Sequence, residues 1–275
     1  CVVAKALHVR GDSMANPDKY RNFGFRQAFY AHFTECGTDC FNMSVLGKDQ
    51  YKSLLRWLGD AGVLKKTVKN GKETVLAELT ELGQKLLPFG PYNPFPWAIM
   101  WANLAYDSIV SRCFCLNVEN GATFDNAYLV DCLDSDIDEK YRKQAVNSLL
   151  STFRDSPIGT VIKQGINFNK TLYVRAGWDY PHAAALLYAL YLYAERTGRR
   201  SFTFTDLVNA HNTPDGAGMS PADIFGIDVK NFREQVQGLA VSFPKYIRVS
   251  FVANLDNIIL EPEVSSLDIL ALAEE

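Results

Sequence analysis

The 275-residue sequence has little of what marks several large classes of protein. It has no excess of charge of one sign, because 28 Lys and Arg stand against 31 Asp and Glu, for a net charge of −3. This balance excludes a general attraction to nucleic acid or to an anionic membrane, so any contact with DNA must come from a local basic surface. The most apolar runs, 95–106 and 181–194, are shorter than the roughly 20 residues that span a bilayer. They predict buried helices and no membrane partner.

Familiar catalytic motifs are also missing. The chain contains no glycine-rich phosphate loop, no HExxH zinc motif and no GxSxG nucleophile motif, and its four histidines are scattered. It opens with neither an initiator methionine nor a signal peptide. We therefore expect a chain taken from a longer one, with residues 1–37 as an N-terminal segment that ends an upstream module.

Cysteine is too sparse and too irregularly spaced for a disulfide framework, which favours a reducing cytoplasm. Thiol or metal chemistry is suggested only by TECGTDC at 34–40, where Cys36 and Cys40 are four residues apart and Cys1 could join them. A closed zinc or iron–sulfur site needs four ligands, and no fourth is evident. The alternative is a set of structural thiols. Three further cysteines in apolar surroundings are expected in the core: Cys113, Cys115 and Cys132.

What the sequence does contain is a recurring local pattern, clearest at 48–83. Four apolar residues at spacing i, i+3, i+4, i+7 form one stripe of a helix: Tyr51, Leu54, Leu55 and Leu58. Gly59 and Gly62 can end this helix, Asn70–Gly71 supplies a hairpin turn between two short strands, and Thr80 can cap the next helix. A helix, a hairpin and a helix within about 40 residues are typical of a winged helix.

The same pattern occurs twice more. Helix 138–153 carries Tyr141, Ala145, Leu149 and Phe153 on one face, and helix 228–243 carries Phe232, Val236, Leu239 and Phe243. Each leads into a predicted hairpin, with turns at Asn167–Lys170 and Ala253–Asn257. We predict a mainly α fold with small β-hairpins (α+β), in which tandem winged-helix-like units lie on a helical framework. The predicted units are 38–90, then 91–180 and 181–275, each of the last two with its own core helix.

The first unit has the best candidate surface for DNA. Seven cations stand against two aspartates between residues 48 and 72: Lys48, Lys52, Arg56, Lys65, Lys66, Lys69 and Lys72. Cations on a helix face and beside a wing tip are well placed to bind phosphates, while bases are read from the helix. The alternative is an ordinary solvated or protein-facing surface. In the other two units the cations lie among acidic residues, and Asp134, Asp136 and Asp138 are expected to cap a helix rather than to bind a cation.

Several longer segments resemble the C-terminal region of bacterial phosphoadenosine phosphosulfate (PAPS) reductase-like proteins, which are often encoded in clusters for DNA modification or phage defence. The segments are YNPFPWAIMWANLAYDSIVSRCF (92–114), NSLLSTFRDSPIG (147–159), SPADIFGID (220–228), LAVSFPKYIRVSF (239–251) and LDNIILEPEVSSLDIL (255–270). The similarity extends from about Tyr20 onward. In addition, ECGTD at 35–39 resembles the redox cysteine segment of PAPS reductases, although Thr38 replaces the histidine of that motif.

This resemblance implies that the catalytic domain, of ATP-pyrophosphatase type, precedes the region and is not part of this sequence. Cys1 would then be the last member of an upstream cysteine cluster, and an iron–sulfur or zinc site would be shared with that segment. We expect a non-catalytic accessory region that binds DNA through its winged-helix units. Two alternatives stay open: a scaffold for protein partners, and a thiol- or metal-dependent sulfur-transfer enzyme that uses Cys36.

Overall fold

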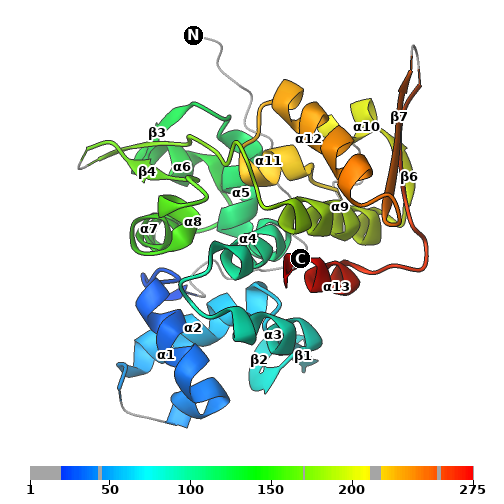
Figure 1. Cartoon of the computed structure of the whole chain (residues 1–275). Coiled ribbons are helices and arrows are strands. Elements are labelled where there is room, and N and C mark those ends of the chain that lie inside the picture. Colours follow the sequence, from blue (N-terminus) through cyan, green and yellow to red (C-terminus); the bar gives the residue numbers. More distant parts are fainter. Residues whose placement is uncertain (1–19, 43–44, 170, 211–217, 253–254, 275) are drawn as a thin grey trace. The chain divides into compact units, whose positions relative to one another are not determined.

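The computed structural model describes residues 20–42, 45–169, 171–210, 218–252 and 255–274. The chain forms two compact bodies, which divide between Ala176 and Gly177. We call them the N-terminal and the C-terminal body. Both are mainly helical with small antiparallel sheets (Figure 1), which confirms the predicted fold class. Within the described residues, no helix is long and apolar enough to cross a membrane.

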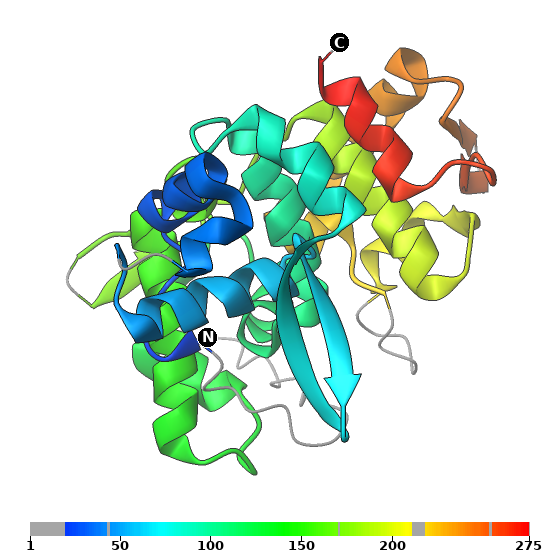
Figure 2. The ribbon, with the colours of Figure 1, turned by 90° about the horizontal axis from the view of Figure 1, so that it is seen from below.

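The N-terminal body begins with the described end of the predicted N-terminal segment, which carries α1 (Gln27–Cys36). The first predicted winged-helix-like unit, 38–90, follows. Its elements are a 3₁₀ helix that begins one residue earlier (Gly37–Asn42), α2 (Lys48–Asp60), β1 (Leu64–Lys69), β2 (Lys72–Leu79), α3 (Glu81–Leu86) and a 3₁₀ turn (Leu87–Phe89). As predicted, the strands meet at Asn70–Gly71, where both residues have positive φ, and the Thr80 side chain caps α3. Figure 2 shows the hairpin projecting from the end of α2 as a long ribbon. Its sheet has only two strands.

The core of this body is built on aromatic side chains from α2 and from α4 (Pro94–Asp107). Every α4 residue from Phe95 to Tyr106 is buried, as the apolar run at 95–106 predicts. Trp57 of α2 is fully buried and stacks on Tyr20, with ring centroids 3.7 Å apart. The Trp57 indole N–H also donates to the Phe23 carbonyl at 2.9 Å. These contacts fix α2 against the segment that precedes α1.

The second unit has the complete winged-helix topology. Its elements are α5 (Ile109–Asn117), β3 (Thr123–Asp125), α6 (Asn126–Cys132), α7 (Glu139–Asp155), α8 (Pro157–Thr160), β4 (Ile166–Asn167) and β5 (Leu172–Val174). A strand ahead of the two helices pairs with the last strand of the hairpin, giving the antiparallel order β3-β5-β4. The helix α7 buries Ala145, Leu149 and Phe153 as predicted, but it leaves Tyr141 exposed.

The C-terminal body repeats this topology. Its elements are α9 (Ala183–Thr197), β6 (Ser201–Thr203), α10 (Phe204–Val208), α11 (Pro221–Phe225), α12 (Val229–Ser242), β7 (Ile247–Val252), β8 (Leu255–Leu260), α13 (Ser266–Ile269) and a 3₁₀ helix (Leu270–Glu274). The antiparallel sheet has the order β6-β8-β7. The α12 stripe is buried at Phe232, Val236 and Leu239, whereas Phe243 follows the helix and is half-buried.

Candidate nucleic-acid interface

The helix α2 places Lys48 and Lys52 away from its buried face. Its core side is formed by Tyr51, Leu54, Trp57 and Leu58, while Leu55 is only half-buried. Lys48 and Lys52 are exposed. Because they lie four residues apart on a regular helix, their side chains leave from neighbouring turns of one face.

Two further exposed lysines flank the hairpin tip. Lys69 and Lys72 are paired across the hairpin, directly beside the Asn70–Gly71 turn. Within the described part of the chain, no carboxylate forms an ion pair with Lys48, Lys52, Lys69 or Lys72. We call these four residues the lysine patch. Their ammonium groups are open to an external anion at two places, the start of α2 and the wing tip.

The other three predicted cations are engaged within the fold. Lys65 Nζ lies 3.1 Å from Glu78 Oε2 across the hairpin, in an exposed ion pair. Arg56 is half-buried against β2, where its guanidinium donates to the Glu73 carbonyl at 3.4 Å. The Arg56 contact ties α2 to the hairpin, and the Lys65 contact joins the two hairpin strands, so both cations already have partners within the fold.

Lys66 is enclosed by three carboxylates. Its Nζ lies 3.4 Å from Asp60, 3.5 Å from Asp107 and 3.8 Å from Glu73. Burial disfavours the charged ammonium, but the three carboxylates outweigh this effect and raise the pKa of Lys66. The lysine compensates the fully buried Asp60, so its positive charge is already balanced within the fold.

Three cations of the other two units are held by neighbouring groups, whereas Lys140 and Lys230 are exposed. Arg142 donates to the carbonyls of Ile137 and Val130, and Lys143 pairs with Glu139 one turn away. In the C-terminal body, Arg233 pairs with Asp256 at 2.7 Å. The predicted cap also forms, because the Asp138 side chain accepts from the N–H of Lys140 at the start of α7.

The thiol segment places a histidine beside a cysteine. Cys36 is half-buried, and its Sγ lies 3.8 Å from His32 Nδ1, one helical turn away. The other ring nitrogen, Nε2, lies 3.4 Å from the Tyr51 hydroxyl. Cys40 is buried, and burial raises its pKa to about 12, with a further contribution from Cys36 and Asp39. Burial therefore favours the protonated thiol at Cys40.

A metal centre is not formed by the described residues, which contain no group of three or more His, Cys, Asp or Glu arranged to hold an ion. Cys1 lies outside the described residues, so its predicted partnership with Cys36 and Cys40 stays a prediction. Cys113, Cys115 and Cys132 are buried, as their apolar surroundings predict.

Comparisons with known proteins bear on the fold. Neither a protein-family profile nor a curated protein matches the chain. Two solved structures are similar over 95% of this chain and 87% of theirs: a magnesium-bound crystal structure of SspB, with TM-score 0.68 and 13% identity, and a second SspB crystal structure, with TM-score 0.66 and 12% identity. At this identity the likeness extends to the fold alone.

Proposed function

We propose that this protein is a DNA-binding accessory region, which holds a duplex through phosphate contacts from the lysine patch. The main observation in support is the lysine patch itself. Its four lysines are exposed at the start of α2 and at the hairpin tip, and none of them has a carboxylate partner in the described structure. Backbone phosphates are the ligands that such unpaired ammonium groups favour. With a net charge of −3, the attraction is local to this surface.

The topology of the other two units supports the same proposal. Each carries a three-stranded sheet and a helix pair in the winged-helix order, an arrangement that many DNA-binding proteins use to offer a helix and a wing. Because the exposed lysines of these units lie among acidic residues in the sequence, such as Lys140 after Asp138 and Glu139, we assign the electrostatic contact to the first unit. Binding would be mostly sequence-tolerant.

The biological setting follows from the family resemblance. We propose that the region serves a PAPS reductase-like protein in DNA modification or phage defence, and that it presents DNA to a catalytic domain upstream or in a partner. The five cysteines in the described residues are all free, which suits a reducing cytoplasm. The chain by itself would then not turn over a substrate.

Salt-dependent binding tests the proposal. We expect a labelled duplex to bind with a log–log salt slope of about −3.6 for four phosphate contacts, at about 0.9 per contact. Replacing all four patch lysines by Gln should abolish most of this slope in fluorescence anisotropy titrations. The matched control is Lys65→Gln, which removes a cation already paired with Glu78. Equal slopes for the wild type and the fourfold variant would contradict the proposal.

The alternative to DNA binding is a scaffold that binds protein partners. A set of exposed apolar side chains supports this alternative. Tyr92, Tyr180 and Val241 are each about four-fifths exposed, at 80%, 82% and 83%. A protein partner would bury such residues. Retention of a cognate partner, with no mobility shift of DNA at low salt, would favour this function over DNA binding.

A second candidate function is sulfur transfer at Cys36, because of its contact with His32. An imidazole beside a thiol can accept its proton and raise its nucleophilicity. If Cys36 acts in this way, iodoacetamide should alkylate it at neutral pH faster than an ordinary thiol, and His32→Gln should remove the difference. An ordinary alkylation rate in the wild type would eliminate this candidate.

A further inference from the structure

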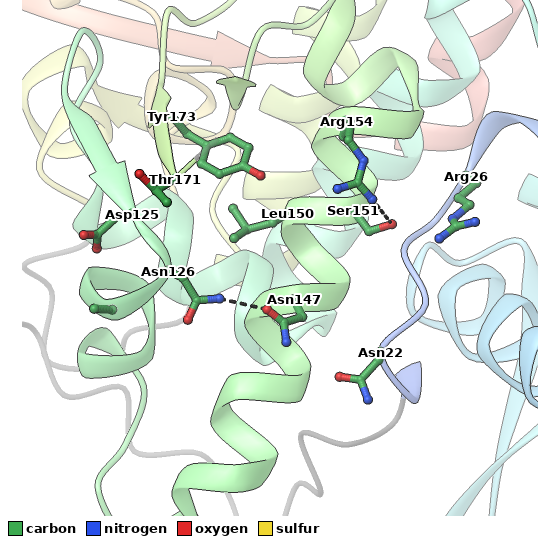
Figure 3. Close-up of a pocket in the computed structure, with 11 residues that line it drawn as sticks. Asn22, Arg26, Asp125, Asn126, Asn147, Leu150, Ser151, Arg154, Thr171 and Tyr173 are labelled. Carbon is green, nitrogen blue, oxygen red and sulfur yellow. Dashed lines mark hydrogen bonds between the residues drawn. The ribbon is translucent and has the colours of Figure 1, made fainter. Parts of the chain in front are cut away.

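A polar cavity lies in the N-terminal body, beside the second winged-helix unit and away from the residues used above. Its volume is about 800 Å³, within the range of small-molecule sites. It is lined by side chains of α7, β5, the start of α6 and the segment before α1: Asn22, Arg26, Asp125, Asn126, Ala127, Asn147, Leu150, Ser151, Arg154, Thr171 and Tyr173. Figure 3 shows ten of these side chains, labelled, and the segments from which they come.

One end of the cavity is basic. Arg154 and Arg26 both contact Asp155, at 3.2 Å and 3.3 Å from their Nε atoms, so two guanidinium groups share one carboxylate. Arg154 also donates to Ser151 through Nη2, while its Nη1 donates to no described residue. Neither terminal nitrogen of Arg26 has a hydrogen-bond partner in the described structure. This end therefore has a net charge of +1, with unused donors on Nη1 of Arg154 and on the terminal nitrogens of Arg26, and such donors suit a phosphate.

The other end of the cavity carries a carboxylate and two side-chain amides, which can form hydrogen bonds with a ligand. Asp125 uses one carboxylate oxygen to cap α6 through the Tyr128 N–H, which leaves its second oxygen for another donor. Asn126 donates to Asn147 at 2.9 Å, so the Asn147 amide group retains both of its N–H donors. In Figure 3, Asp125 and Asn126 lie on the opposite side of the view from Arg26, and Asn147 lies between Asn126 and Asn22.

The spacing along α7 gives the length of the site. Asn147 and Arg154 are seven residues apart on one helix, which separates them by about 10 Å along its axis. Leu150 and Tyr173, both buried, supply apolar surface between the two ends. A bare inorganic anion would fill only the arginine end. A ligand that fits the whole cavity has a phosphate at one end, an apolar face in the middle and polar donors and acceptors at the other.

We infer that this cavity binds a nucleoside 5′-monophosphate, either free or at the end of a nucleic-acid strand. Arg154 and Arg26 hold the phosphate, the base or sugar packs on Leu150 and Tyr173, and the amides and Asp125 bind its polar edge. This site shares no residue with the lysine patch, so it does not rest on the proposed duplex binding.

Calorimetric titration of the intact chain tests the inference. The probes are the four ribonucleoside 5′-monophosphates, the matching nucleosides, inorganic phosphate and a 5′-phosphorylated dinucleotide. At least one monophosphate should bind tenfold or more tightly than its nucleoside and than phosphate. Equal binding of the dinucleotide identifies the end of a strand as the ligand, and its exclusion identifies the free nucleotide. Absence of binding by every monophosphate at millimolar concentration would overturn the inference.

Three variants make the test specific. Arg154→Gln should weaken monophosphate binding by about tenfold or more, the usual effect of losing a charged hydrogen bond. Asp155→Asn should strengthen binding several-fold, because it frees both guanidinium groups. Lys48→Gln/Lys52→Gln should leave nucleotide affinity unchanged while it weakens duplex binding, which separates this inference from the proposed function. Thermal unfolding of each variant controls for folding, and an Arg154→Gln protein that folds and binds normally would contradict the site.

Discussion

At the scale of single residues, Asp60, the last residue of α2, is a buried charged group whose partners come from several segments. Its carboxylate is fully buried and accepts a hydrogen bond from the Tyr20 hydroxyl at 2.6 Å. Lys66 lies 3.4 Å away and supplies a compensating charge. A buried carboxylate is tolerated only with such partners, because its desolvation is costly. The loop before α1, the end of α2 and the first strand therefore depend on one another through this side chain.

We predict that Asp60→Ala lowers the free energy of unfolding by about 3 kcal/mol, since it leaves the buried Tyr20 hydroxyl without its acceptor and removes one of the three carboxylates that face Lys66. The measurement is urea denaturation followed by tryptophan fluorescence. Glu78→Ala is the control, because it breaks the exposed pair with Lys65 and should cost less than about 1 kcal/mol. Equal losses of unfolding free energy in the two variants would show that the buried cluster contributes no more to stability than an exposed ion pair.

At the scale of helices and strands, close packing of the first hairpin depends on Gly83 in α3. A Cβ at this position would lie 2.3 Å from the Val63 carbonyl oxygen, which is backbone and cannot rotate away. Gly238 of α12 is the opposite case, with helical φ and nothing within 4 Å of a built Cβ. The same substitution should therefore act in opposite directions at these two glycines.

We predict that Gly83→Ala destabilises the protein by about 2 kcal/mol or more, although alanine favours a helix by about 1 kcal/mol over glycine. Gly238→Ala should instead stabilise it by about 0.5–1 kcal/mol. Thermal and urea unfolding of the two variants provide the comparison. Stabilisation by Gly83→Ala would mean that α3 does not pack on the hairpin as described.

The elements also show how far the sequence could predict this fold. The amphipathic helices and the Asn-Gly hairpin were predictable, because their signals lie within a few turns of chain. The strands β3 and β6 were missed, since each is three residues long and forms only by pairing with a distant hairpin strand. These two strands are what distinguish a complete winged helix from a helix and a hairpin.

The candidate sites were likewise predictable only in part from the sequence. Charge spacing revealed Lys48 and Lys52, but it could not show that Lys66 faces Asp107, which is 41 positions later in the chain. The nucleotide cavity had no sequence signal at all, because Arg26 and Arg154 come together only through the packing of α7 against the segment before α1. The spacing of residues along the sequence predicts which side chains share one face of a helix. Which residues that face contacts depends on tertiary structure.

At the scale of the whole molecule, the question is whether DNA affinity follows net charge or local charge. The chain carries −3 overall, and the Debye length is about 8 Å at physiological salt. Charges farther from the phosphates than this are screened. Two substitutions that change the net charge equally should therefore act differently, according to where they lie.

We predict that Lys48→Gln/Lys52→Gln reduces the log–log salt slope of duplex binding by about 1.8, at about 0.9 per lost contact. The charge-matched control, Lys230→Gln/Lys245→Gln, removes two exposed lysines of the C-terminal body and should leave the slope unchanged. Anisotropy titrations from low to moderate salt measure both. If the two double variants lose the same slope, the contact is not confined to the lysine patch, and binding would have to be reassigned to a broader surface that includes the third winged-helix unit.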